Sequence, residues 1–399
     1  MSMVYATRMD SLRASEIREI LKITQREEVI SFAGGLPAPE LFPVEMLKEI
    51  SCQVLAESGR SALQYSTTEG YEPLRQKIAE RIGRKFQTKV SAQQVLITCG
   101  SQQALDFTGK LFLDEGDVVL CESPTYLAAI SAFRAYQPQF VEVPTDDNGM
   151  IMAALEKILA TTDRVKLIYV IPDFQNPTGR TWSLERRQRL VELATRYEIP
   201  VIEDNPYGEL RFEGEILPSL KSMDTAGLVI GTGTFSKTFC PGMRIGWLIA
   251  EPDIIEKYVL IKQGADLCTS LRSQMEVDMF MERYDFEENL CKLTNLYRKR
   301  RDAMVGALEE MMPAGVKFTR PQGGLFLWVE LPKHIPAVEL LRECLKRDVA
   351  FVPGDAFFPN GGVKNTLRLN YSNMPEDRIH EGIRRLAGVI RQISMQCAG

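Results

Sequence analysis

The residues best equipped for chemistry stand around Lys237, in the stretch GTGTFSKTFCPGMRIG. Hydroxyl groups at Thr234 and Ser236 precede the lysine, and a Pro-Gly pair after it predicts a turn that brings Arg244 back toward them. Hydroxyls and a guanidinium suit a phosphate, and a lysine amine can form a Schiff base with an aldehyde. A phosphate loop of the ATPase type needs glycine directly before its lysine, and Ser236 excludes that interpretation.

This segment resembles the signature of fold-type I pyridoxal-phosphate aminotransferases, which implies pyridoxal 5′-phosphate as the cofactor bound to Lys237. A protonated ring nitrogen requires a buried carboxylate, and Asp204 ends an apolar run at residues 199–203. Tyr207 follows three residues later and is expected to donate to the oxygen on the cofactor ring. Both are expected to act in catalysis with Lys237. The alternative for Asp204 is a turn or helix-cap role, which is common after strands.

Further cofactor ligands are expected at neighbouring strand ends. Asn176 lies in an Asn-Pro-Thr-Gly sequence after an apolar run and supplies a second donor to the ring oxygen, although this sequence is also an ordinary turn. Gly100, Ser101 and Gln102 lie where a strand passes into a helix, whose free N–H groups suit a phosphate. Tyr126 follows the next strand and either stacks on the pyridine ring or belongs to the core.

Five further segments narrow the resemblance to the branch that contains the 2-aminoadipate and kynurenine aminotransferases. They are Ser31 to Pro39, Gln64-Tyr65, Glu69-Gly70-Tyr71, Gly100 to Gln103 and Asn365 to Leu369.

The branch implies roles at the substrate. Arg368 would grip the α-carboxylate of the amino acid, with Asn176 beside it, because a guanidinium fixes both position and orientation. Tyr65 would reach the phosphate and substrate of the neighbouring subunit, which implies a homodimer with shared active sites. Arg18 would meet an acidic substrate side chain, and Gly35 would keep that wall open; a solvent-facing helix position is the alternative for Arg18. Thr234 replaces the commoner serine and keeps the hydroxyl.

The resemblance implies transfer of an amino group from an L-amino acid to a 2-oxo acid such as 2-oxoglutarate. The expected donors are 2-aminoadipate and glutamate, with leucine or aromatic amino acids as further candidates. One alternative is a C–S lyase or decarboxylase on the same scaffold. Another is the effector-sensing half of a transcription factor, which would follow a DNA-binding domain. Amino transfer to 2-oxoglutarate distinguishes the first, and DNA binding the second.

The secondary-structure elements that must position these residues alternate between predicted strands and predicted helices. Between residues 95 and 250, short β-branched runs alternate with helical patterns, which predicts a mostly parallel sheet flanked by helices. After about residue 297 a helix and short strands predict a smaller α+β domain. We therefore expect an N-terminal arm and helix at 1–45, associated with the small domain, a large cofactor-binding domain at 46–296 and a small C-terminal domain at 297–399.

Composition supports an ordinary globular enzyme of the cytoplasm. The 399 residues carry a net charge of −5 and 45% hydrophobic residues, and no basic block points to nucleic acid. The eight cysteines are scattered singly, so neither a zinc site nor a disulfide framework is expected. Only two histidines are present, which disfavours Ser/His/Asp catalysis and His-rich metal sites. No signal peptide or membrane-spanning run is expected, so no membrane partner is predicted.

Overall fold

The computed structural model describes residues 3–10 and 28–398. Its α-helices are α2 (Val44–Ala62), α3 (Glu72–Phe86), α4 (Ser101–Phe112), α5 (Leu127–Arg134), α6 (Met152–Thr161), α7 (Leu184–Tyr197), α8 (Leu220–Met223), α9 (Pro252–Gln263), α10 (Leu271–Arg283), α11 (Phe286–Met311), α12 (Ala337–Leu345) and α13 (Glu376–Ala398). The strands are β1 (Ile30–Ser31), β2 (Val95–Cys99), β3 (Val118–Ser123), β4 (Gln139–Asp146), β5 (Gly149–Met150), β6 (Val165–Val170), β7 (Val201–Asp204), β8 (Val229–Thr234), β9 (Ile245–Ile249), β10 (Lys317–Phe318), β11 (Phe326–Glu330), β12 (Val349–Ala350), β13 (Val352–Pro353) and β14 (Thr366–Asn370).

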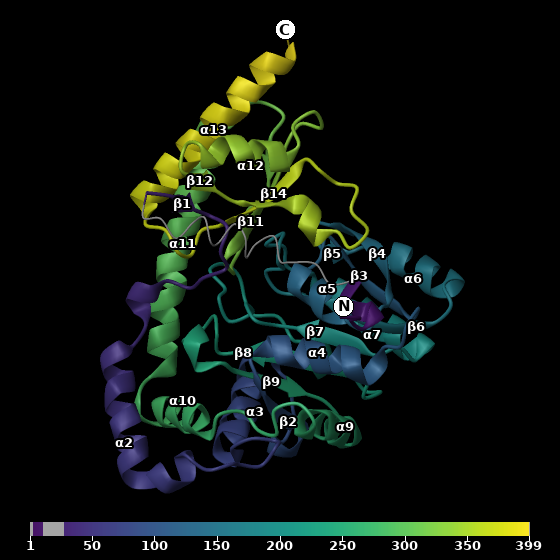
Figure 1. The fold of residues 1–399 in the computed structure, drawn as a ribbon, viewed down its shortest axis with the longest axis vertical. Helices are drawn as coiled ribbons and strands as arrows, with labels where there is room; N and C mark the ends of the chain where they lie inside the picture. Colours follow the sequence, from purple (N-terminus) through teal and green to yellow (C-terminus); the bar gives the residue numbers. More distant parts are fainter. Residues whose placement is uncertain (1–2, 11–27, 399) are drawn as a thin grey trace.

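One large sheet has the order β2-β9-β8-β7-β6-β3-β4-β5. The neighbours from β8 through β7, β6 and β3 to β4 are parallel, whereas β9 and β5 run antiparallel to their neighbours. Helices including α4, α7 and α9 lie around this sheet (Figure 1). The predicted α/β class with a mostly parallel, helix-flanked sheet is confirmed.

The central strands are apolar on both faces because helices cover both. In β6, Leu167 and Tyr169 join a core shared with α4, α5 and α9, while Ile168 and Val170 join the core beneath α6 and α7. The same alternation in β7 places Ile202 with the first set. Residues two apart on a strand share a face, so Asp204 lies on the same face as Ile202 and Tyr169. This register brings the carboxyl and the phenol together.

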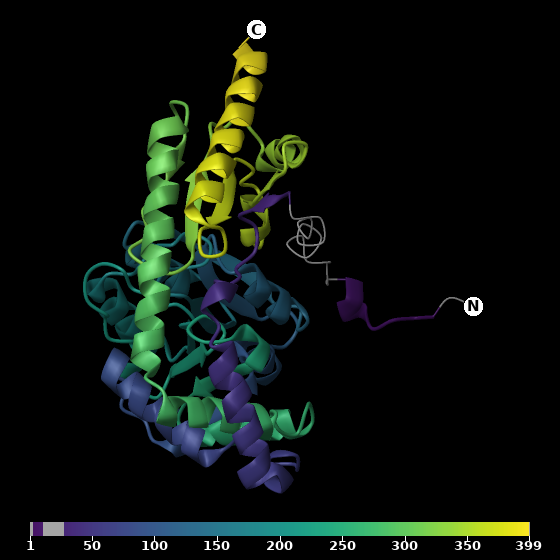
Figure 2. The same cartoon turned by 90° about the vertical axis from the view of Figure 1, so that its left-hand side faces the viewer.

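A second, smaller sheet has the order β10-β11-β14-β13 and is antiparallel throughout. It lies with α12 and α13 above the large sheet in Figure 1. The long helix α11 runs beside α13, as Figure 2 shows with α11 in green and α13 in yellow. The smaller α+β domain that the sequence predicts after about residue 297 is therefore present.

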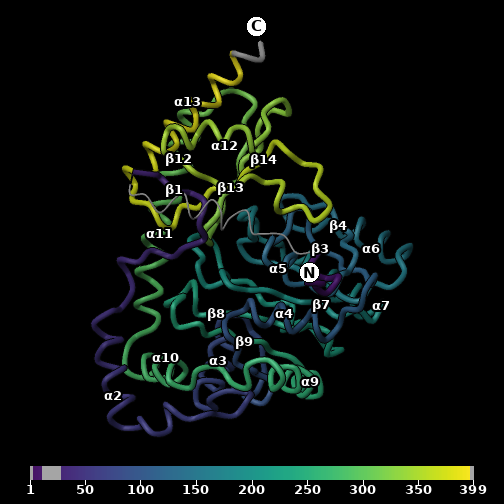
Figure 3. Tube along the Cα trace, viewed as in Figure 1, coloured from purple at the N-terminus to yellow at the C-terminus, as the bar shows by residue number. Residues whose placement is uncertain are grey.

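The N-terminal part of the described chain connects the two regions. β1 pairs in parallel with β12 of the small region, and the chain then descends to α2, which packs on α10 (Figure 3). The expected boundary between residues 296 and 297 falls inside the continuous helix α11. The division at residues 45/46 and 296/297 stays a prediction.

Among the described residues, no helix is long and apolar enough to span a bilayer.

Candidate active site

Lys237 lies in the turn that follows β8, at the carboxyl end of the parallel strands. Its Nζ donates a hydrogen bond to the carbonyl oxygen of Gly35, at 2.8 Å. Burial, and next the positive charges of Arg368 and Arg244, lower the pKa of Lys237 to about 8. The amine is therefore closer to its neutral, nucleophilic form than an ordinary lysine amine at neutral pH.

Two buried hydroxyl groups lie just before this lysine. Thr234 Oγ1 donates to Ser236 Oγ at 2.9 Å, and the backbone N–H of Ser236 donates to Thr234 Oγ1 at 3.0 Å. Arg244 has a left-handed backbone conformation, φ 54°, after the Pro-Gly turn. The structure thus places a hydroxyl pair and a guanidinium at the ends of one short loop, as the sequence suggested.

Gly100 and the start of α4 lie against Arg244. A Cβ atom on Gly100 would lie 2.6 Å from Arg244 Nη2, and the φ of Gly100 is +71°. α4 begins at Ser101, so its first N–H groups are free to bind an anion beside that guanidinium. The side-chain amide of Gln102 donates one hydrogen bond to the carbonyl of Ala128, at 3.1 Å, while its backbone N–H lies in the first turn of α4.

Gly246, the second residue of β9, is a residue that the sequence analysis did not single out. A Cβ atom there would lie 2.6 Å from both Gly100 C and Ser101 N, which are backbone atoms. Only glycine lets β9 approach the start of α4 this closely. The signal was the final glycine of the Pro-Gly-x-Arg-x-Gly sequence itself.

Asp204 is the last residue of β7 and is 1% exposed. Its Oδ2 accepts a hydrogen bond from the hydroxyl of Tyr169 at 2.8 Å, whereas Oδ1 is buried with no hydrogen-bond partner among the described residues. Burial raises the pKa of this carboxyl to about 7. A buried carboxylate oxygen with no donor is costly unless a cation or N–H group faces it.

Tyr126 lies among the charged groups of the site. Burial, and next the charge of Asp204, raise the pKa of its phenol to about 12, while Arg368 and Arg244 oppose that rise. These groups act on one ring although they come from distant parts of the chain. The placement is compatible with both predicted roles of Tyr126, stacking on a ligand and packing in the core.

Asn176 connects Tyr207 to Arg368. Its Nδ2 donates to the hydroxyl of Tyr207 at 3.4 Å, and Arg368 Nη1 donates to its Oδ1 at 2.9 Å. Tyr207 follows β7, Asn176 follows β6, and Arg368 lies in β14 of the small sheet. Three residues from two sheets thus form one chain of hydrogen bonds.

Two aromatic rings hold the guanidinium of Arg368, and the sequence analysis did not identify either. The rings of Phe326 and Phe357 have their centroids 4.2 Å and 5.2 Å from its Cζ. Arg368 Nη2 donates to the carbonyl of Ala33 at 2.6 Å, and Nε has no partner among the described residues. Burial lowers the pKa of Arg368 to about 10. Sequence spacing carries no sign of these contacts, because they depend on how the small sheet packs.

The remaining predicted residues differ in placement. Gly35 lies at the site, since it accepts the hydrogen bond of Lys237 and a Cβ on it would meet Phe326 at 3.0 Å. Tyr65 is 77% exposed, and no hydrogen bond from its hydroxyl occurs within the described part of this chain. Arg18 lies outside the described residues.

These residues fit pyridoxal phosphate. The unpaired Oδ1 of Asp204 matches the need of a pyridinium N–H, and the amine of Lys237 matches the aldehyde. Because Gly100 has no side chain, the Arg244 guanidinium lies beside the start of α4, where its charge and the free N–H groups of the helix suit an anion. The donor set therefore suits a phosphate, an aldehyde and a ring nitrogen together.

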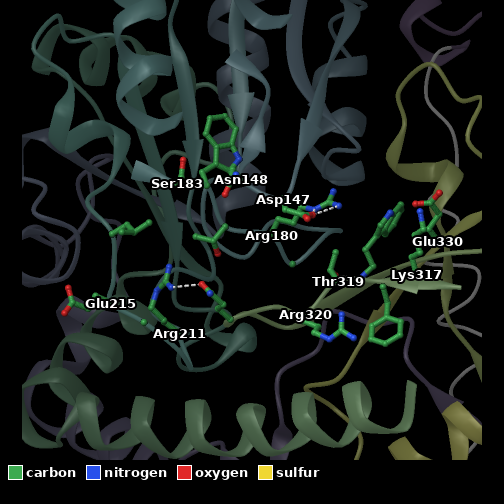
Figure 4. A pocket seen from close by; sticks show the side chains of 18 residues that line it. Asp147, Asn148, Arg180, Ser183, Arg211, Glu215, Lys317, Thr319, Arg320 and Glu330 are labelled. Carbon is green, nitrogen blue, oxygen red and sulfur yellow. Dashed lines mark hydrogen bonds and ion pairs between the residues drawn. The ribbon is translucent and has the colours of Figure 1, made fainter. Parts of the chain in front are cut away.

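A separate cleft of about 820 Å³ lies at the seam of the two sheets and contains none of the predicted site residues. Figure 4 shows Arg180 paired with Asp147 on its wall. Two other arginines that line this cleft also form ion pairs: Arg320 pairs with Glu309, and Arg211 lies 3.7 Å from Asp173. Its charges are largely balanced within the protein.

The sequence profile of the family "Aminotransferase class I and II" matches residues 27–386. The aromatic-amino-acid aminotransferase 1 of Thermococcus litoralis is 48% identical over 385 residues, covering 96% of this chain and 92% of that protein. The kynurenine aminotransferase of Pyrococcus horikoshii, solved with PMP and kynurenine, is 44% identical with a TM-score of 0.93, covering 98% and 97% of the two chains. LysN, the α-aminoadipate aminotransferase of Thermus thermophilus, solved with N-(5′-phosphopyridoxyl)-L-leucine, is 44% identical with a TM-score of 0.91, covering 98% of each chain.

The chain belongs to the class I and II aminotransferases. It is a pyridoxal-phosphate-dependent enzyme that transfers amino groups between amino acids and 2-oxo acids. The family, cofactor and reaction inferred from the sequence are confirmed, and the lyase and sensor alternatives are set aside.

Proposed function

We propose that Lys237 carries the cofactor and that the residues around it divide the work of amino transfer. The observation that carries this proposal is the buried environment of the Lys237 amine, whose pKa is lowered by burial and then by the positive charges of Arg368 and Arg244. Arg244 suits the phosphate of the cofactor, and Arg368 suits the carboxylate of the substrate. The amine of Lys237 therefore lies close enough to two anion-binding groups to be affected by their charges.

The cofactor-binding residues act at three positions. Arg244, Ser236, Thr234 and the N–H groups from Gly100 to Gln102 hold the phosphate. Asp204 keeps the ring nitrogen protonated through its free Oδ1, and Tyr126 stacks on the ring. Tyr207 and Asn176 donate to the ring oxygen, and the hydrogen bond between them fixes their spacing. When bound, pyridoxal phosphate supplies the electron sink that accepts charge developing at the substrate α-carbon.

Two groups then act on the substrate. Arg368 binds the α-carboxylate and is held in place by Asn176 and two aromatic rings, so the α-carbon is oriented before reaction. The Nζ of Lys237 would take the α-proton of the substrate as general base and would deliver it, as general acid, to C4′ of the cofactor. A pKa near 8 suits that exchange at neutral pH, because both protonation states are accessible.

We propose 2-aminoadipate, glutamate, leucine and aromatic amino acids as donors, with 2-oxoglutarate as acceptor. The relatives support this range, since they are described as acting on aromatic amino acids, kynurenine and α-aminoadipate, and one binds a leucine adduct. The proposed contact of Arg18 with acidic side chains rests on the sequence. Arg18→Ala is expected to reduce kcat/KM for 2-aminoadipate more than for leucine; an equal loss for both contradicts the contact.

We further propose a homodimer in which Tyr65 completes the phosphate and substrate site of the neighbouring subunit. The exposure of its phenol within one chain supports this assignment. Mixing Tyr65→Phe protein with Lys237→Ala protein tests it. Mixed dimers recover a site that has both Tyr65 and Lys237, so activity should return; no recovery despite subunit exchange argues against sharing.

A cytoplasmic location is proposed as well, since the seven cysteines whose side chains are described are free thiols, as in a reducing compartment. Cell fractionation tests this proposal.

Absorbance spectra of the purified enzyme test the central proposal. The visible band of the bound cofactor should move to shorter wavelength after addition of L-glutamate and return with 2-oxoglutarate. Repeating the titration with 2-aminoadipate, leucine and kynurenine ranks the donors. A protein that shows no cofactor band after reconstitution contradicts the role of Lys237.

A further inference from the structure

The carboxyl group of Asp204 depends on one hydrogen-bond donor. The only donor to it in the described structure is the hydroxyl of Tyr169, which binds Oδ2 at 2.8 Å. The titratable groups that face it are the phenols of Tyr126, Tyr169 and Tyr207, whose own pKa values are raised by burial first and also by the charge of this carboxyl. Within residues 3–10 and 28–398, no lysine or arginine compensates its charge directly.

The strand register and the packing around Tyr169 hold its side chain in position for that hydrogen bond. Tyr169 lies in β6, which pairs in parallel with β7, and its register partner is Ile202, two residues before Asp204. The side chain is 1% exposed and packs edge-on against Phe133 of α5, with ring centroids 5.7 Å apart. Burial raises the pKa of its phenol well above the ordinary value, so the hydroxyl stays protonated and remains a donor.

The adjacent carboxyl on the same strand shows a different arrangement. Glu203 points to the opposite face and accepts two backbone N–H groups, from Leu220 at 2.7 Å and Lys221 at 3.0 Å, at the start of α8. Both oxygens of Glu203 are thus occupied, as expected for a structural carboxylate. In Asp204, by contrast, Oδ2 accepts a hydrogen bond and Oδ1 has no partner among the described residues. The hydroxyl of Tyr169 determines that Oδ2 is the oxygen that is bound.

We propose that Tyr169 is a positioning residue for amino transfer: its hydroxyl holds Oδ2 of Asp204, keeps the carboxyl ionised and presents Oδ1 to the ring nitrogen of the cofactor. The inference rests on the proposed role of Asp204. Without the hydroxyl, the carboxyl is free to rotate and to take up a proton, and its hold on the ring nitrogen weakens. The electron sink then weakens with it, although Arg368 and the substrate contacts are unchanged.

Tyr169→Phe removes the hydroxyl and keeps the ring, and Tyr258→Phe is a matched control. Tyr258 is also fully buried, and its hydroxyl shares a 2.8 Å hydrogen bond with Thr108 Oγ1 away from Asp204. Both variants lose one buried hydroxyl. Thermal unfolding of both holoenzymes checks that each is folded.

Three measurements separate positioning from packing. The kcat of Tyr169→Phe should fall roughly ten- to hundredfold, as for loss of a hydrogen bond to a charged group, with KM for the amino acid changed less than about threefold. With cofactor labelled by ¹⁵N in the ring, the ring nitrogen should lose its proton at lower pH than in wild type. In the apoprotein, which carries no cofactor, the loss of stability with rising pH should extend to higher pH, because Asp204 loses the donor that lowers its pKa.

Tyr258→Phe should match wild type in all three measurements. The inference is overturned if Tyr169→Phe matches Tyr258→Phe in ring-nitrogen titration and kcat, or if both variants lose activity equally. A wild-type enzyme whose ring nitrogen is unprotonated, or one that binds no cofactor, would instead refute the proposed role of Asp204 or of Lys237.

Discussion

Replacing Gly246 by alanine adds one methyl group at the tightest backbone contact of the proposed phosphate site. The new Cβ would lie 2.6 Å from Gly100 C and Ser101 N. These are backbone atoms at the start of α4, so no side-chain rotation relieves the overlap. Either β9 or the first turn of α4 must move by several tenths of an ångström.

The expected cost follows from overpacking. Extra methyl groups in well-packed regions cost about 1–3 kcal/mol. The displaced atoms include the backbone N–H of Ser101, which we propose as a phosphate ligand, so much of this cost should appear in cofactor binding. At about 1.4 kcal/mol per factor of ten, the dissociation constant of pyridoxal phosphate should rise roughly 5- to 150-fold.

Gly242 provides the matched control, because it lies four residues earlier, in the turn before β9, and a Cβ there would meet nothing within 4 Å. Apoproteins of wild type, Gly246→Ala and Gly242→Ala would be titrated with pyridoxal phosphate and followed by absorbance and thermal unfolding. Only Gly246→Ala should weaken binding. Wild-type affinity in Gly246→Ala, or an equal loss in Gly242→Ala, would refute the argument that this contact shapes the phosphate site.

Three further outcomes are expected. Lys237→Ala should abolish turnover and the visible cofactor band while the protein stays folded. Borohydride reduction of wild type should attach the cofactor mass to Lys237 but not to the buried Lys262, and label on a different lysine contradicts the assignment. Arg368→Lys should raise KM for every amino acid roughly ten- to hundredfold with an unchanged cofactor spectrum, because lysine cannot form the bidentate pair; an unchanged KM would show that Arg368 does not bind the carboxylate. In the apoprotein, the raised pKa of Asp204 means that the native state keeps its proton to higher pH than the unfolded chain, so stability should fall as pH rises from about 4 to about 7, by at most about 4 kcal/mol from this group. Urea unfolding at pH 5 and pH 8 should show a smaller fall for Asp204→Asn than for wild type; equal falls would contradict the raised pKa.

The amino-acid sequence alone determined the class of fold and the reaction. Apolar runs of four to six residues, each ending in polar or glycine residues, predicted the strands of the large sheet because parallel strands are buried on both faces. The loop around Lys237 could also be recognised from the sequence, because its residues are close together in the chain. One turn brings together Thr234, Ser236, Lys237 and Arg244, which lie within eleven residues, so their spacing alone indicates the proposed phosphate- and aldehyde-binding loop.

Contacts between residues that lie far apart in the sequence were decided only by the tertiary structure. Tyr169 meets Asp204 because β6 and β7 pair in one register, and a shift of one residue would turn the phenol to the opposite face. Arg368 was recognised from a motif, yet Phe326, Phe357 and the carbonyl of Ala33, which hold it, come together only when the small sheet packs on the N-terminal segment. Sequence spacing encodes contacts made within a turn, whereas strand register and domain packing depend on the burial of whole apolar faces.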